Sequence, residues 1–85
     1  MLKTVQPDKQ GEIAECIKRN LERYFSKLEG APPNPVYDMV IRAAEKPMLE
    51  LVMERTAGNQ SEAAAILGIN RNTLRKKLTE HRIDV

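Results

Sequence analysis

Residues 58–78 read GNQSEAAAILGINRNTLRKKL, and this stretch decides the fold of the chain. Gly58 tolerates positive φ and can end the helix before it, and Gly68 allows a sharp turn ten residues later. Asn59 and Asn70 are favourable N-cap residues directly after these breaks. The pattern predicts two short helices joined by a tight turn.

Apolar residues in this stretch recur at helical spacing. The first short helix has an apolar face, the second has a buried pair of leucines, and an isoleucine fills the angle between them; these residues are Ala63, Ala64, Leu67, Leu74, Leu78 and Ile69. Glu62 lies three residues after Asn59, where the acidic residue of a capping box belongs. Each short helix therefore has a start signal and a core face.

Positive charge gathers on the second short helix. Residues 1–70 hold nine Lys or Arg against ten Asp or Glu, whereas residues 71–85 hold five against two. The exposed side carries Arg71, Arg75, Lys76 and Lys77. A short helix, a glycine turn and a basic second helix are typical of a helix-turn-helix that binds in the major groove of DNA. A helical hairpin with a solvated basic face is the alternative.

A first amphipathic helix is predicted over residues 12–29. Its apolar residues step by three or four and include Ile13, Ile17, Leu21, Tyr24 and Leu28. Gly30 ends it, and prolines stiffen the loop that follows. Cys16 lies beside the stripe and is expected to be a small, half-buried hydrophobe. Met1–Gly11 shows no sustained period and is expected to be a flexible arm.

The second and longest helix is predicted over residues 35–57, with Asn34 as its cap. Apolar residues surround much of this helix, which one short neighbour cannot cover. We therefore expect a homodimer in which the long helices of two subunits share a core. The positions expected in that core are Val40, Ala44, Met48, Leu51 and Val52. Pro47 lies mid-helix and should either kink it or split it in two.

The sequence contains no recognisable arrangement of catalytic residues. It has one histidine and one cysteine, far apart, and no glycine-rich phosphate loop or metal-ligand spacing. We expect no catalytic residues, no metal and no cofactor. His81 lies near the end of the last helix, where a cation favours the helix dipole. No apolar run is long enough for a membrane span, so no membrane partner is expected.

The chain resembles the Fis family (factor for inversion stimulation), which are small bacterial nucleoid proteins. The resemblance covers about Ile13–Leu78, includes Pro47–Met53, and is most specific at Gly58–Gln60 and Gly68–Leu78. It implies an all-α homodimer of four helices per subunit with a C-terminal helix-turn-helix. It also implies a cytoplasmic, nucleoid-associated protein that binds double-stranded DNA with little sequence preference and serves nucleoid organisation, transcription and recombination.

Carried over by position, the resemblance implies that Arg71 reads guanine, because a guanidinium offers two donors to O6 and N7. Asn70 should touch base edges beside it. The residues implied to hold phosphates are Asn59, Ser61, Thr73, Arg75, Lys76 and Lys77. The chain departs from the family at Glu62, where a basic residue is usual. Its arm is also short, which argues against contact with a recombinase.

Three expectations complete the interpretation. The chain should divide into an arm (1–11), dimerisation helices (12–57) and a helix-turn-helix (58–85) within one compact domain. Binding should bend DNA, because the resemblance implies that the two reading helices lie closer together than straight DNA requires. The alternatives are a detached DNA-binding domain similar to that of nitrogen-regulation-type activators, or a helical dimerisation module whose basic end binds an acidic protein.

Overall fold

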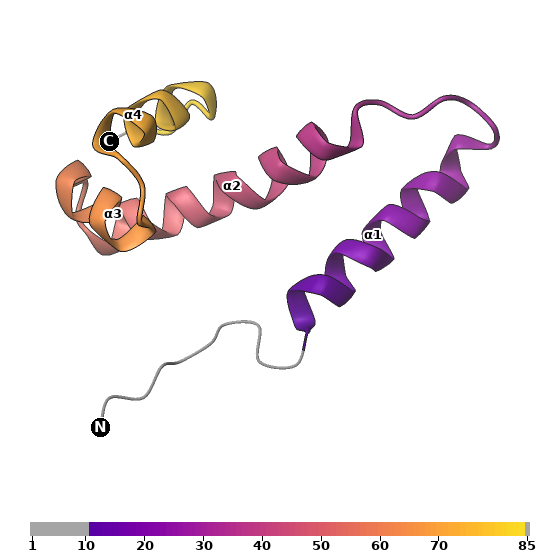
Figure 1. Cartoon of the computed structure of the whole chain (residues 1–85), viewed down its shortest axis with the longest axis horizontal. Helices are drawn as coiled ribbons and strands as arrows, with labels where there is room; N and C mark the ends of the chain where they lie inside the picture. The colour runs from indigo at the N-terminus through magenta and orange to yellow at the C-terminus, as the bar shows by residue number, and fades with distance from the viewer. Residues whose placement is uncertain (1–10, 85) are drawn as a thin grey trace. The chain divides into compact units, whose positions relative to one another are not determined.

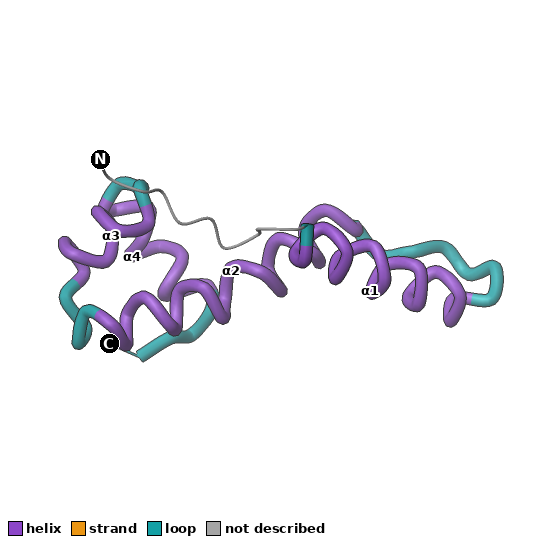
Figure 2. The backbone as a smooth tube through the Cα atoms, turned by 90° about the horizontal axis from the view of Figure 1, so that it is seen from below, coloured by secondary structure: helices purple, strands orange, loops and turns teal. Residues whose placement is uncertain are grey.

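The computed structural model describes residues 11–84 of the chain. This range contains four helices, which are α1 (Glu12–Leu28), α2 (Val36–Arg55), α3 (Gln60–Leu67) and α4 (Arg71–Glu80) (Figure 1). None of the described residues is in a strand (Figure 2), so the predicted all-α fold is confirmed. Residues 1–10 of the predicted arm lie outside the described residues. The expectation about contact with a recombinase concerns this arm and is therefore not tested by the structure.

The described chain divides after Val36 into two units, and the first contains α1 and the loop that follows it. Two left-handed residues, Glu29 and Gly30, end α1 with φ of 50° and 90°. The hydroxyl oxygen of Tyr24 accepts a hydrogen bond from the backbone N–H of Asn34 at 3.0 Å, which ties the loop to the helix. The prediction that Cys16 is half-buried was wrong, because no residue of α1 is buried and Cys16 is exposed.

Helix α2 runs unbroken through Pro47 (Figure 1), so the alternative of two separate helices was wrong. A proline inside a helix removes one backbone donor, which the helix tolerates here without ending. The helix supplies Leu49 and Met53 to the core of the second unit.

Helix α2 ends at Arg55, two residues before the predicted end at residue 57. The N–H of Ala57 donates to the carbonyl of Glu54 (3.2 Å), and the N–H of Gly58 donates to that of Met53 (3.0 Å). These two bonds form a Schellman motif with Ala57, at φ 51°, in the left-handed position just after the helix. Gly58 follows with φ 83°. The chain therefore leaves the helix through two consecutive residues of positive φ.

The core of the second unit is built by three helices. Helices α3 and α4 lie over the C-terminal end of α2 (Figures 1 and 2). The buried apolar side chains come in pairs from α2, α3 and α4, and they are Leu49, Met53, Ala63, Ala64, Leu74 and Leu78. The helix-turn-helix is thus fixed to the end of α2, and the predicted core faces of both short helices are confirmed.

Candidate functional site

The N-terminus of α3 is capped as predicted, but only by half of a capping box. The side-chain oxygen of Asn59 accepts a hydrogen bond from the backbone N–H of Glu62 at 3.0 Å. In a capping box, the carboxylate of Glu62 would accept a hydrogen bond from the backbone N–H of Asn59. Here that N–H donates to the carbonyl of Thr56 at 3.0 Å. Glu62 therefore has no part in the cap as an acceptor, and its predicted capping role was wrong.

The turn between α3 and α4 is set by backbone hydrogen bonds. Gly68 has φ 72°, and its N–H donates to the carbonyls of Ala64 (2.9 Å) and Ala65 (3.3 Å). The N–H of Ile69 also donates to Ala64 (3.1 Å), while the Ile69 side chain packs against the core. The next residue, Asn70, caps α4 through a 2.7 Å bond from the N–H of Asn72 to its side-chain oxygen. The first turn of α4 is consequently held at a defined angle to α3.

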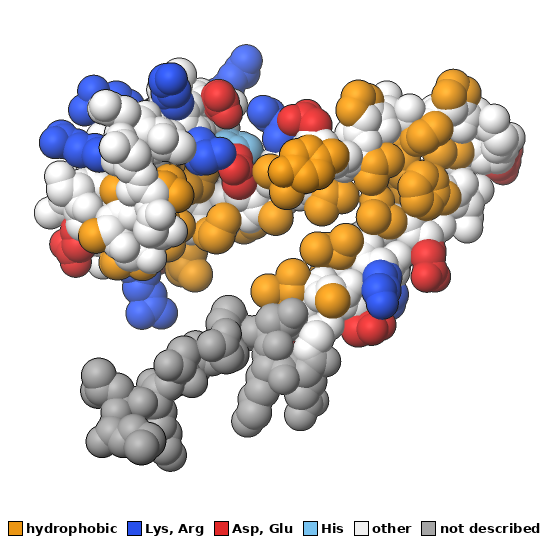
Figure 3. Space-filling view, viewed as in Figure 1, with side chains coloured by type: hydrophobic (Ala, Val, Ile, Leu, Met, Phe, Trp, Pro, Cys, Tyr) orange, Lys and Arg blue, Asp and Glu red, His pale blue; other side chains and the backbone are white. Residues whose placement is uncertain are grey.

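All but one of the polar side chains predicted to form the site are exposed on α3 and α4. They are Asn59 and Ser61 at the start of α3, and Asn70, Arg71, Thr73, Arg75 and Lys76 at the start and outer side of α4. Figure 3 shows basic side chains gathered over α3 and α4. The first turn of α4 contains no acidic residue, so its positive dipole end is not neutralised there. Such a surface suits phosphate oxygens and the acceptor atoms of base edges.

Lys77 differs from the other predicted contacts. Its ammonium lies 2.5 Å from Oε2 of Glu45 on α2, and its side chain is 30% exposed. The other carboxylate oxygen, Oε1, lies 3.0 Å from Nε2 of His81, whose side chain is 3% exposed. Because an ionised carboxylate only accepts, the Nε2 of His81 carries the hydrogen. We refer to these three residues as the Glu45 cluster.

Charge in the Glu45 cluster is stabilised by mutual contact. The hydrogen bond from His81, and then that from Lys77, lower the pKa of Glu45 below its ordinary value. The hydrogen bond to Glu45 raises the pKa of Lys77. This cluster was not predicted from the sequence. A signal was present, because His81 continues the spacing of the buried Leu74 and Leu78 and therefore falls on the core side of α4.

The residues predicted for a shared core are mostly uncovered in the single subunit. Met48 and Leu51 are 48% and 55% exposed, Ala44 is exposed, and Val40 is half-buried. Val52 packs against the core of its own subunit. Figure 3 shows apolar side chains exposed along α1 and along the first half of α2. The role of these residues in a dimer stays a prediction.

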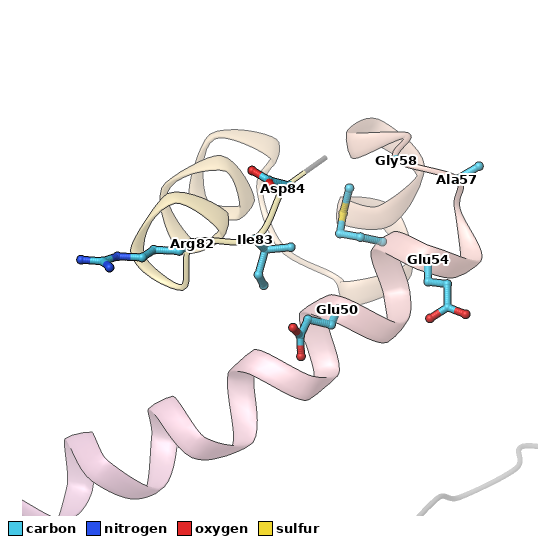
Figure 4. Close-up of a pocket in the computed structure, with 8 residues that line it drawn as sticks. Glu50, Glu54, Ala57, Gly58, Arg82, Ile83 and Asp84 are labelled. Atoms are coloured by element: carbon cyan, nitrogen blue, oxygen red, sulfur yellow. The ribbon is translucent and has the colours of Figure 1, made fainter.

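An open depression of about 500 Å³ lies between the second half of α2 and the C-terminal segment. Met53 and Ile83 line it together with Glu50 and Asp84 (Figure 4). The side chain of Arg82 points away from it, so no convergent set of polar groups faces a ligand. Within residues 11–84, no group of potential ligands is placed to hold a metal ion, and no helix meets the length and hydropathy of a membrane span.

The core, the glycine turn and the exposed basic helix define a helix-turn-helix protein. The chain belongs to the Fis family of bacterial regulatory proteins, whose family model matches residues 40–81. It is 57% identical over 70 residues to a Fis-like DNA-binding protein of Neisseria meningitidis serogroup A, covering 82% of this chain and 89% of that protein. A Fis-like DNA-binding protein of Ralstonia nicotianae is 56% identical over 69 residues, covering 81% and 90%.

The DNA-binding protein Fis of Escherichia coli O1:K1 is also similar. It is 43% identical over 72 residues, which cover 85% of this chain and 74% of that protein. The resemblance on which the predicted fold was based is thereby confirmed.

Proposed function

We propose that this chain binds double-stranded DNA as a homodimer and places the first turn of α4 from each subunit in the major groove. The observation that carries the proposal is the exposed row of amide, hydroxyl and guanidinium groups around the α3–α4 turn. These groups project from a helix that the core fixes to α2. Relatives of 57% and 43% identity that are named as DNA-binding proteins support the DNA-binding part of this proposal.

Within this interface the residues have different roles. Arg71, the first residue of α4, is exposed and offers two parallel donors to guanine O6 and N7. Asn70 caps the helix with its side-chain oxygen, which leaves its amide hydrogens for base edges. The exposed groups that hold phosphates are Asn59, Ser61, Thr73, Arg75 and Lys76.

A homodimer is supported by apolar surface that a single subunit leaves in water. Leu51 is 55% and Ile41 is 37% exposed on α2, and Phe25 is 49% exposed on α1. Two copies that pair along α2 bury Leu51 and Ile41 and gain about 25 cal/mol for each Å² of apolar surface covered. A two-fold dimer also presents two copies of α4 to two half-sites.

Bending follows from the spacing of the two reading helices. Successive major grooves on one face of straight DNA lie about 34 Å apart. Since α4 is held against the end of α2, the two helix-turn-helix units of a compact dimer cannot move apart freely. The DNA therefore curves so that both units reach the major groove. The cost is about 1–6 kcal/mol and depends on the central base pairs. Gel mobility should vary with the position of the site along a fragment, and constant mobility would contradict bending.

The proposed role is regulatory: sequence-tolerant binding that organises the nucleoid and controls transcription. A salt titration with duplex and with single-stranded DNA tests the binding step. A groove reader binds the duplex more tightly than the single strand at moderate salt, and log K for the duplex falls linearly with log salt. Equal affinity for both forms would identify a generic basic surface and contradict the proposal.

A further inference from the structure

We propose that Glu45 acts as an internal substitute for a DNA phosphate: it holds the ammonium of Lys77 and keeps that lysine out of the DNA interface. This inference rests on the proposed function, since it concerns the number of phosphates that α4 neutralises. In this inference Glu45, which lies on α2 outside the helix-turn-helix, controls the affinity of α4 for DNA.

The position of Lys77 on α4 makes it a natural phosphate contact. It lies four residues after Thr73 and seven after Asn70, so the three share one stripe of the helix. Thr73 and Asn70 are exposed, whereas Lys77 is half-buried. The backbone thus places Lys77 beside the proposed interface, and its side chain turns back toward α2 to reach Glu45.

Glu45 is well placed to retain the lysine. Each of its two oxygens has one partner, Lys77 on Oε2 and His81 on Oε1, and its side chain is only 17% exposed. The imidazole of His81 is buried and fixes the carboxylate from the other side. Moving Lys77 onto a phosphate would leave the charge of Glu45 with His81 alone in a partly desolvated position, which is costly.

Lys76 provides the comparison within the same helix. It is exposed, and among residues 11–84 no acidic side chain forms an ion pair with it. Adjacent lysines of α4 therefore differ in availability: Lys76 is free to meet a phosphate and Lys77 is held. The difference arises from tertiary structure, because Glu45 is 32 residues away in the chain from Lys77.

The salt dependence of duplex binding tests the inference, because log K against log salt has a slope of about −0.9 for each phosphate neutralised. Glu45→Gln keeps the shape of the side chain and removes its charge. It should release Lys77 and steepen the slope by about one unit per subunit. The double variant Glu45→Gln/Lys77→Met keeps the net charge of the original pair and should restore the wild-type slope. Lys76→Met should flatten the slope by about one unit per subunit.

Each outcome decides the question. A salt slope for Glu45→Gln equal to that of the wild type would overturn the inference. A slope for the double variant as shallow as that of Lys76→Met would also overturn it, because it would mean that Lys77 already binds a phosphate in the wild type. If Glu45→Gln does not fold, Lys77→Met alone decides, since the inference predicts a wild-type slope and a direct contact predicts a flatter one. Failure of the wild-type protein to prefer duplex DNA would refute the proposed function itself, which is a separate result.

Discussion

The imidazole Nε2 of His81 lies 3.0 Å from Oε1 of Glu45, and this contact joins the last turn of α4 to the middle of α2. The two residues are 36 positions apart in the chain. Both are largely withdrawn from water, so the bond is stronger than a similar one on the surface. It fixes the C-terminal end of the proposed reading helix, whose other end is fixed by the glycine turn.

The first prediction concerns acid. Contact with His81 and Lys77 lowers the pKa of Glu45 from its ordinary value of 4.5. A folded-state pKa below the unfolded one stabilises the protein above pH 4.5, and that stabilisation is lost as the pH falls through the folded-state pKa. Urea unfolding at a series of pH values should therefore show a shallower acid loss for Glu45→Gln than for the wild type. Glu50→Gln, an exposed change on the same helix, controls for the lost charge, and parallel profiles for Glu45→Gln and wild type would contradict the prediction.

A second prediction concerns the turn. A Cβ added to Gly68 would meet no atom within 4 Å, but φ is 72°. Gly68→Ala should therefore lower the free energy of unfolding by about 1–2 kcal/mol through backbone strain alone. Ala57 has the corresponding position after α2, and Ala57→Gly relieves the same kind of backbone strain. It also raises the conformational entropy of the unfolded chain, which opposes that gain, so the net change in the free energy of unfolding should be smaller. Chemical denaturation measures both, and equal losses would show that the turn conformation is not the cause.

A third prediction concerns assembly. Leu51→Glu places a charge in the proposed shared core, where its desolvation is unfavourable. Because Leu51 is 55% exposed in the single subunit, the substitution should leave the fold of the second unit intact and dissociate the dimer. Ile66→Glu is the matched control, since Ile66 is 59% exposed on α3. Sedimentation at micromolar concentration should find Leu51→Glu monomeric and Ile66→Glu dimeric. If both variants were dimeric, Leu51 would not lie in the dimer interface and the prediction would be wrong.

Local chemistry explains what could be predicted from the sequence. Asn59 and Asn70 act through side-chain hydrogen bonds to the next turn, and Gly68 acts through its own backbone. Because these contacts are local, residue type and spacing are sufficient to indicate their roles. The core faces of α3 and α4 follow from helical periodicity in the same way. At the end of α2 the prediction is two residues too long, because Ala57 already adopts the left-handed conformation that favours glycine.

Tertiary contacts explain the rest. Spacing along α4 shows that Lys77 is near the proposed interface, but only the packing of α4 against α2 shows that Glu45 holds it. Similarly, Glu62 has the position of a capping-box residue, yet Thr56 supplies the acceptor for the Asn59 N–H. Val52 belongs to the apolar surface of α2 and packs on its own subunit's core. Each case depends on a partner that the local pattern does not specify.

The most direct test of the account compares Arg71→Ala with Lys76→Ala on two duplexes, a preferred one selected from a random pool and a random one. Loss of a base-reading arginine should cost about 1–3 kcal/mol per half-site on the preferred duplex and much less on random DNA. Loss of a phosphate-binding lysine should weaken both duplexes alike. The account predicts a reduced affinity ratio for Arg71→Ala and an unchanged ratio for Lys76→Ala. Equal weakening of both duplexes by Arg71→Ala would contradict it.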